Sequence, residues 1–255
     1  MTDKAALLGR LRAIAEAAGQ ETLRFYGKCD AQHKADGSPV TAADEAAESL
    51  ILPQLRALTP DIPVVSEEEA SKGLAPERAG GAFWLVDPLD GTKEFISENG
   101  EFTVNIALIE NNTPVLGIVV APALGRTWFG AANAGAFRAE NGSTAPIRVR
   151  TPPAEGLTVV GSRSHGDAAA MEQFLGGVRV ASFRPAGSSL KLCLIAEGEA
   201  DLYPRLGTTM EWDIAAGHAV LRAAGGSLAA PDGAPFTYGK ASEGFKNGGF
   251  VARGG

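Results

Sequence analysis

The sequence predicts a mixed fold, α+β in its amino-terminal part and α/β in its carboxy-terminal part. Three observations predict this class. Two stretches before residue 60 repeat apolar residues at helical spacing, and short apolar segments closed by turns follow from Pro63 onward. Beyond Pro152 and Pro153, strand-like and helix-like segments alternate.

The first sixty residues contain two helical patterns. Apolar residues recur every three or four positions between residues 7 and 25, which predicts an amphipathic helix ending around Gly27. A second helix is expected from residue 41 to about residue 58. Pro53 should kink or interrupt it, because proline lacks the backbone N–H that a helix interior needs.

The middle of the chain reads as strands. The expected strands are 64–65, 82–86, 102–109, 115–120, 128–129 and 147–149. The first two end abruptly in acidic residues and are continuously apolar, which is typical of strands buried on both faces. The turn at Asn111 and Asn112 predicts a hairpin between its neighbours, at the centre of a sheet.

The remaining residues follow an α/β rhythm. Strands are expected at 157–160, 178–183 and 201–203, and helices from about Asp167, from Ser188 and from Trp212. The proline pair at 152–153 therefore suggests two parts, 1–150 with the acidic motifs and 151–255 with substrate-side residues. Without a long linker, we expect them to pack as one unit with the site between them.

Size and charge limit the class of function. A chain of 255 residues, 45% of them apolar, can bury a large core, and no run approaches the roughly 18 apolar residues of a membrane span. The formal net charge of −7 argues against a nucleic acid polymer as partner, because phosphate backbones need a basic surface. We expect a cytoplasmic monomer or homodimer with a small-molecule partner; loose association with the inner membrane surface is left open.

Acidic residues cluster around apolar segments at three places. Asp87 and Asp90 stand three residues apart after one strand, with proline and glycine to fold a turn in which both face one point. Glu67 follows the preceding strand, and Asp213 precedes a helical stretch. Four carboxylates can thus converge from three segments.

Carboxylate oxygens suit hard cations, and no histidine or cysteine cluster favours zinc, so Mg²⁺ is the natural candidate. Two like charges about 4 Å apart repel by roughly 4 kcal/mol at an effective dielectric near 20, so a packed cluster favours a bound cation. Each acid also has a structural explanation, as a turn residue, a solvated edge or a helix first-turn charge. Cys29 and Cys193 are expected to be buried thiols, and His33 and His218 receive no role.

Two further features allow two readings each. Gly91 and Thr92 open a turn whose backbone N–H groups could hold an anion, although many such turns exist only for conformation and capping. Thr41 and Asp44 approximate a capping box, and Asp44 could equally orient a water nucleophile.

These residues resemble the inositol monophosphatase superfamily. The matching segments are 66–68 (SEE), 84–95 (WLVDPLDGTKEF) and 212–217 (WDIAAG). Within the superfamily, residues 99–108 (NGEFTVNIAL), 187–191 (GSSLK) and 202–205 (LYPR) look like the CysQ-type 3'(2'),5'-bisphosphate nucleotidases. The resemblance covers most of the chain and implies a layered αβαβα fold.

The resemblance also implies roles for the acidic residues. The implied metal ligands are Glu67, Asp87, Asp90 and Asp213, with the backbone carbonyl of Leu89, around two or more Mg²⁺ ions. Gly91 and Thr92 would hold phosphate. Asp44 matches the family's acidic partner of the threonine, and the pair Asp44 and Thr92 is implied to orient the attacking water.

The substrate end is implied in the same way. Ser188 and Lys191, one helical turn apart on the expected helix, would contact a second phosphate, with Arg205 nearby. His165 could contact the nucleotide, or it could be a structural loop residue near a strand end. The phosphate that reacts would lie among Glu67, Leu89, Asp90, Gly91, Thr92 and Asp213.

The implied reaction is Mg²⁺-dependent hydrolysis of the 3'-phosphate of 3'-phosphoadenosine 5'-phosphate, to AMP and phosphate. Such hydrolysis needs alignment and charge neutralisation more than a covalent nucleophile. The resemblance further implies inhibition by lithium and a place in sulfur metabolism. An inositol- or sugar-phosphate phosphatase of the same superfamily is the alternative, and a non-catalytic metal- and phosphate-binding protein is the alternative of another class.

Overall fold

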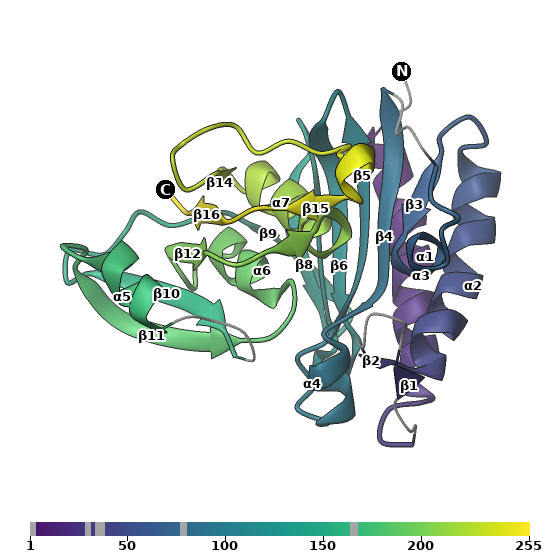
Figure 1. Cartoon of the computed structure of the whole chain (residues 1–255), viewed down its shortest axis with the longest axis horizontal. Helices are drawn as coiled ribbons and strands as arrows, with labels where there is room; N and C mark the ends of the chain where they lie inside the picture. The colour runs from purple at the N-terminus through teal and green to yellow at the C-terminus, as the bar shows by residue number, and fades with distance from the viewer. Residues whose placement is uncertain (1–3, 29–31, 34–38, 77–80, 164–167) are drawn as a thin grey trace.

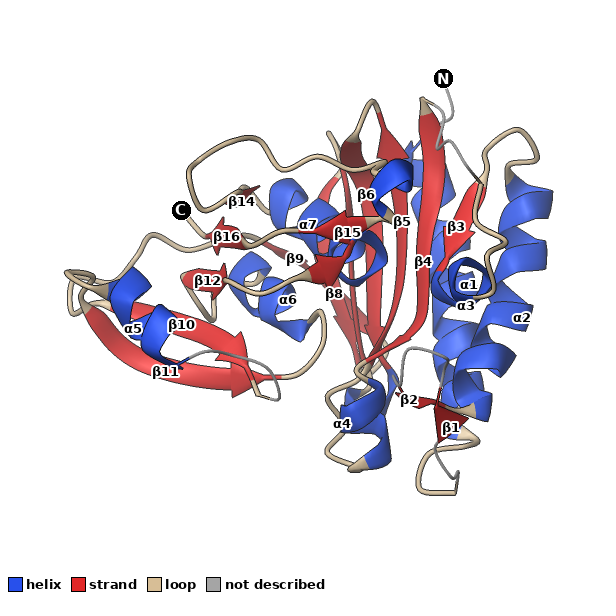
Figure 2. Cartoon of the chain, viewed as in Figure 1, coloured by secondary structure: helices blue, strands red, loops and turns tan. Residues whose placement is uncertain are grey.

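A computed structural model describes residues 4–28, 32–33, 39–76, 81–163 and 168–255 of the chain (Figure 1). Three residues named from the sequence, Cys29, His165 and Asp167, lie outside the described residues. The described elements stack in five layers, in which helices and sheets alternate (Figure 2). The expected αβαβα layering is therefore confirmed.

The larger sheet has seven strands, in the order β3-β4-β5-β6-β7-β8-β9. Their bounds are β3 Val64–Ser66, β4 Ala82–Asp90, β5 Thr103–Glu110, β6 Thr113–Ala121, β7 Arg126–Ala131, β8 Gly135–Glu140 and β9 Ser143–Ile147. The predicted hairpin is β5 and β6, near the centre of the sheet. β3 pairs with β4 in parallel, and the later neighbours are antiparallel.

Both faces of this sheet are covered, as the continuously apolar strand β4 predicts. Trp84 and Val86 face α1 (Lys4–Leu23) and α2 (Ala42–Leu58), whereas Phe83 and Leu85 face α6 (Leu190–Ala196) and α7 (Glu211–Ala223). Since successive strand residues point to opposite faces, one strand contributes to two cores.

The smaller sheet has five strands, in the order β11-β10-β12-β16-β14. Their bounds are β10 Leu157–Ser162, β11 Val180–Ala186, β12 Leu202–Arg205, β14 Ser227–Ala229 and β16 Phe250–Arg253. β10 pairs in parallel with β11 and β12, as the α/β rhythm predicts, whereas β16 pairs antiparallel with β12 and β14. Helix α5 (Ala168–Leu175) packs on the outer face, and α6 and α7 fill the layer between the sheets (Figure 1).

The short elements complete the architecture. They are α3 (Glu67–Ser71), α4 (Thr92–Ile96), the 3₁₀ turns at Pro122–Leu124 and Ala241–Glu243, and two small ribbons formed by β1 (Gln32–His33) with β2 (Pro39–Val40) and by β13 (Thr209–Met210) with β15 (Lys246–Asn247). No helix among the described residues is long and apolar enough to cross a membrane.

Several boundaries differ from the predicted ones. The first helix ends at Leu23, because residues 24–28 form a turn in which Gly27 adopts a φ of +71°. Pro53 does not interrupt α2, which continues to Leu58. Pro53 and the residue four positions earlier, Ser49, are both exposed, so the carbonyl that loses its helical partner faces solvent.

The strand expected at 147–149 is also wrong, since β9 ends at Ile147. Val149 instead donates its backbone N–H to the carbonyl of Ala224, 3.1 Å away, just beyond α7. The chain leaves the larger sheet at this point and enters the smaller sheet at Leu157.

Helix α7 lies unusually close to the larger sheet. A Cβ atom on Gly117, in β6, would lie 2.3 Å from the carbonyl oxygen of Ala216, and one on Gly130, in β7, would lie 2.9 Å from the Cβ of Ala223. Glycine at these two strand positions therefore permits the close approach that brings the start of α7 against the end of β4.

Candidate active site

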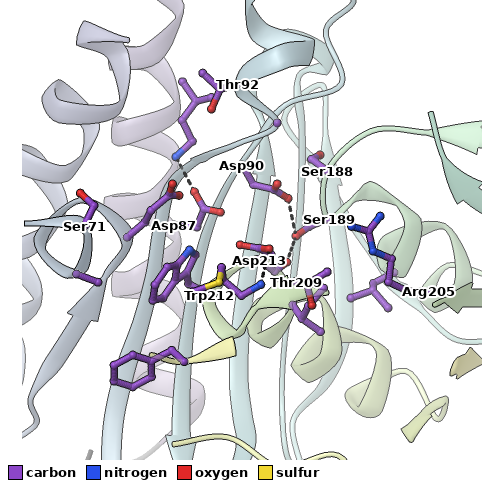
Figure 3. A pocket seen from close by; sticks show the side chains of 18 of the residues that line it. Ser71, Asp87, Asp90, Thr92, Ser188, Ser189, Arg205, Thr209, Trp212 and Asp213 are labelled. Atoms are coloured by element: carbon purple, nitrogen blue, oxygen red, sulfur yellow. Dashed lines mark hydrogen bonds between the residues drawn. The ribbon is translucent and has the colours of Figure 1, made fainter. Parts of the chain in front are cut away.

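A cavity of about 900 Å³ opens where the ends of β4, β12 and α7 meet (Figure 3). Residues distant in the sequence line it together. The sequence-predicted residues in its wall are Glu67, Asp87, Leu89, Asp90, Gly91, Thr92, Ser188, Lys191, Arg205 and Asp213. Asp44 is not part of the wall, and His165 lies outside the described residues.

Asp87 and Asp90 are positioned by a β-bulge, not by the turn that the sequence suggested. Strand β4 continues to Asp90; Asp87 pairs with Asn105 and Asp90 with Thr103, so one extra residue is accommodated in β4. The backbone N–H of Leu89 donates to Oδ1 of Asp87 at 3.0 Å, which holds the bulge.

Glu67 and Asp213 reach the same place from other elements. Ser66 pairs with Val86 in the parallel β3–β4 ladder, so Glu67, the first residue of α3, lies beside Asp87. Asp213 lies in the first turn of α7, where its Oδ2 accepts the N–H of Met210 at 2.8 Å. Both side chains are half-buried in the cavity wall.

The buried acids in the cavity wall repel one another, and their pKa values are raised. Burial, followed by the charges of Glu67, Asp90 and Asp213, raises the pKa of Asp87 well above its usual range. Burial and the neighbouring Asp90 do the same to the pKa of Asp213. The pKa of Asp90 rises to about 6 through burial, and the positive charge of Lys191 opposes that rise. A cation between the acids would relieve this repulsion.

The donor set fits a hard cation. Five acidic residues, the four predicted ligands and Glu94, line one cavity with the segment that carries the Leu89 carbonyl, and none of the described residues in its wall is a histidine or cysteine. Among the described residues, no three histidine, cysteine or acidic side chains are arranged so that they could hold an ion by themselves. Mg²⁺ is commonly bound by one or two carboxylates, with waters and substrate phosphates completing its octahedron.

Asp44 serves as the predicted helix cap. Its Oδ2 accepts both the N–H and the hydroxyl of Thr41, each at 2.8 Å, and the Thr41 oxygen accepts the N–H of Ala43 at 3.2 Å. Asp44 is only 1% exposed, and burial raises its pKa to about 7. The charge of Asp44 also contributes to the raised pKa of Asp87, so the cap lies near the acidic group.

Gly91 and Thr92 form the start of α4. Gly91 adopts a φ of +89°, which favours glycine, and a Cβ there would lie 3.3 Å from the Cβ of Ser188. Thr92 is half-buried in the cavity wall. The helix that follows has five residues.

Ser188 and Lys191 do not share a helix as predicted, because α6 begins at Leu190. Ser188 precedes it with a φ of +40°, uncommon for a residue with a side chain, and its buried hydroxyl has no hydrogen-bond partner among the described residues. Lys191 is 5% exposed, and its Nζ donates to the carbonyls of Ala186, at 3.1 Å, and Ser188, at 2.6 Å. Burial lowers the pKa of Lys191 to about 8.

Arg205 ends β12, on the same side of the cavity as Ser188 and across it from Asp87 (Figure 3). Its Nη2 donates to the carbonyl of Thr208 at 3.1 Å, whereas its buried Nε finds no partner in the described part of the chain. Besides its acidic residues, the described wall of the cavity thus carries three basic residues, Lys93, Lys191 and Arg205.

Sequence reasoning missed Ser189, which contacts two of the candidate metal ligands. Its hydroxyl lies 3.2 Å from Oδ2 of Asp90 and 2.7 Å from the carbonyl oxygen of Asp213 (Figure 3). Nothing in the spacing distinguishes Ser189 from Ser188. In the structure, Ser188 adopts a φ of +40° and the hydroxyl of the next residue, Ser189, faces Asp90.

Comparison with known proteins identifies the family of the chain. The model of the inositol monophosphatase family matches residues 4–250, so the chain belongs to that family, whose enzymes are metal-dependent phosphatases.

Within that family, its relatives include the 3'(2'),5'-bisphosphate nucleotidase CysQ of Escherichia coli K12, with 48% identity over 96% of this chain and 98% of that protein. The CysQ protein of Haemophilus influenzae is 32% identical over 91% of this chain and 87% of its own.

Solved structures show the same architecture. The crystal structure of CysQ from Bacteroides thetaiotaomicron aligns with a TM-score of 0.80 and 33% identity, and covers 98% of this chain and 97% of that one. An IMPase from Thermotoga maritima aligns with a TM-score of 0.77 and 26% identity, over 94% of this chain and 89% of its own.

Proposed function

We propose that the protein is a Mg²⁺-dependent 3'(2'),5'-bisphosphate nucleotidase. It removes the 3'-phosphate of 3'-phosphoadenosine 5'-phosphate and yields AMP and phosphate. The near full-length similarity to bacterial CysQ nucleotidases carries this proposal. A cavity lined both by acidic residues and by Lys191 and Arg205 supports it, because a bisphosphate needs two anion sites.

In this proposal, two or more Mg²⁺ ions are held by Glu67, Asp87, Asp90 and Asp213 with the carbonyl of Leu89. When bound, the ions would supply Lewis-acid neutralisation of the charge on the phosphate ester. The chain's own residues place the ester. Gly91 and Thr92, which follow Asp90 directly and line the cavity, would hold the reacting phosphate beside Asp90.

Asp44 and Thr92 are proposed to orient the attacking water. Asp44 can combine this role with its capping role, because both Thr41 donors bind Oδ2 and leave Oδ1 available in the hydrogen bonds that the structure describes. A carboxylate that accepts a proton from a positioned hydroxyl or water acts most effectively when its pKa lies near the working pH.

The second phosphate would lie against Ser188, Lys191 and Arg205. Two of these residues carry a buried donor without a hydrogen-bond partner among the described residues, the hydroxyl of Ser188 and Nε of Arg205. Burying such a donor unpaired costs about 1–3 kcal/mol, which a phosphate oxygen would offset. His165 is proposed to contact the nucleotide. The substrate is a free nucleotide in the cytoplasm, and the oligomeric state is proposed to be monomer or homodimer.

The test compares phosphate release from 3'-phosphoadenosine 5'-phosphate, inositol 1-phosphate and fructose 1,6-bisphosphate, with Mg²⁺ and with EDTA. We expect the nucleotide to give the highest kcat/KM, and the activity to vanish with EDTA or on Asp90→Asn. A clear preference for inositol 1-phosphate would instead identify an inositol phosphatase. Binding without turnover would identify a metal- and phosphate-binding protein.

A further inference from the structure

The Ser189 hydroxyl joins three segments that the sequence keeps far apart. It lies within hydrogen-bond distance of the Asp90 carboxylate on β4 and of the Asp213 carbonyl on α7, at 3.2 Å and 2.7 Å. The third contact is the side-chain amide of Asn105 on β5, whose Nδ2 donates to the hydroxyl at 2.9 Å. Ser189 is 3% exposed and Asn105 is 1% exposed, so solvent does not compete for these bonds.

Asn105 determines the direction in which the Ser189 hydroxyl donates its hydrogen. A serine hydroxyl has one hydrogen to donate, and it also accepts. Because the Asn105 amide donates to the oxygen, the single hydroxyl hydrogen is left for the Asp213 carbonyl, at 2.7 Å, and the Asp90 carboxylate, at 3.2 Å, which share it in a three-centre hydrogen bond (Figure 3). Asn105 itself is placed by the ladder, in which it pairs with Asp87 at the bulge.

We infer that Ser189, held by Asn105, is a positioning residue that fixes Asp90 relative to the first turn of α7 and so sets the geometry of the metal-binding acids. This inference rests on the proposed metal-dependent function of the site. Both Asp87 and Asp90 occupy a bulge, where one ladder step is lost, so contacts from outside β4 are needed to orient Asp90. Groups that orient metal ligands typically contribute 10- to 100-fold to metal affinity or activity.

The experiment measures Mn²⁺ binding by electron paramagnetic resonance, with the full chain and no substrate. Ser189→Ala is expected to weaken Mn²⁺ binding by about 10- to 100-fold. The same variant should need higher Mg²⁺ for half-maximal hydrolysis and should recover activity when Mg²⁺ is raised, which general damage to the fold would not allow.

The matched control is Thr59→Val. The Thr59 hydroxyl is also buried, donates to the Leu55 carbonyl at 3.2 Å and accepts the Trp84 indole N–H at 2.8 Å, but it is not part of the cavity wall. Its loss should lower the unfolding temperature and leave Mn²⁺ affinity within twofold of the unmodified protein.

Asn105→Leu provides a second, nearly isosteric variant if Ser189→Ala does not fold. It should weaken Mn²⁺ binding less than Ser189→Ala, and adding it to Ser189→Ala should cost little more, because Asn105 acts through Ser189. Unchanged Mn²⁺ affinity in the folded single variants overturns the inference. Failure of the unmodified protein to hydrolyse 3'-phosphoadenosine 5'-phosphate would overturn the proposed function instead and leave the binding result standing.

Discussion

At the scale of single residues, the wall of the cavity contains donors that the rest of the described chain does not satisfy. The Ser188 hydroxyl and Nε of Arg205 are both buried without a partner among the described residues. Each sits where the backbone or a strand end holds it, Ser188 at a φ of +40° and Arg205 at the last residue of β12. Such groups are expected to bind ligand oxygens.

Arg205→Met should therefore raise KM for 3'-phosphoadenosine 5'-phosphate. The loss of hydrogen bonds to a charged group, about 1.5–3 kcal/mol, corresponds to roughly 10- to 100-fold. The effect on 3'-AMP, which lacks the second phosphate, should be much smaller. Steady-state kinetics on both substrates measure this, with Arg184→Met as control because Arg184 is exposed and pairs with Glu199. An equal loss on both substrates would contradict the assignment.

At the scale of elements, the contact between α7 and β6 places Asp213. Gly117→Ala would drive a methyl group into the carbonyl of Ala216, so the free energy of unfolding should fall by about 1–3 kcal/mol or more. Gly9→Ala is the matched substitution, since Gly9 is exposed in α1 with open space around its Cβ position. It should raise stability by about 0.5–1 kcal/mol. Urea unfolding measures both, and a neutral Gly117→Ala would refute the close packing.

Helix α7 also carries a buried histidine that makes stability depend on pH. His218 is 4% exposed, its Nδ1 lies 2.9 Å from the hydroxyl of Tyr238, and burial, with a smaller effect of the Arg222 charge, lowers its pKa to about 3. The unfolded chain binds a proton near pH 6.5 and the folded chain does not. The contribution of His218 is therefore complete above pH 6.5 and is lost as the pH falls toward 3.

His218→Gln isolates this effect. Between pH 7.5 and pH 5.5, the unmodified protein should lose about 1.4 kcal/mol more unfolding free energy than the variant does. Urea unfolding of both proteins at the two pH values measures the difference. Parallel pH profiles would mean that His218 takes up a proton in the folded protein.

At the scale of the whole molecule, the cavity brings mutually repelling acids together from both parts of the chain. A cation that binds the folded state alone stabilises it by about 2.7 kcal/mol at one hundred times its dissociation constant. For a chain of this size, Mg²⁺ should raise the unfolding temperature by about 5–10 °C over EDTA at equal ionic strength. Asp90→Asn should abolish most of this shift. The same unfolding temperature with and without Mg²⁺ would contradict the proposed metal site.

Local sequence patterns predicted most helices and strands of the fold. The strands that were not predicted lack such patterns. Helices α1 and α2 could be predicted from their apolar periodicity, and strands β4, β5 and β6 from their apolar runs, because both signals are properties of neighbouring residues. Strands β8, β14 and β16 lack a strong apolar pattern and exist because other strands pair with them. The division into parts 1–150 and 151–255 stays a prediction, and α7, from the second part, packs on the larger sheet.

The sequence by itself pointed to the four acids that line the cavity and to the family that the chain resembles, because motif residues and their spacing are local information. The tertiary structure alone decided that Asp87 and Asp90 share a bulge, that Ser188 precedes α6, and that Ser189 faces Asp90. These outcomes depend on contacts between β4, β5, α6 and α7, and such contacts form only when segments distant in the chain pack together.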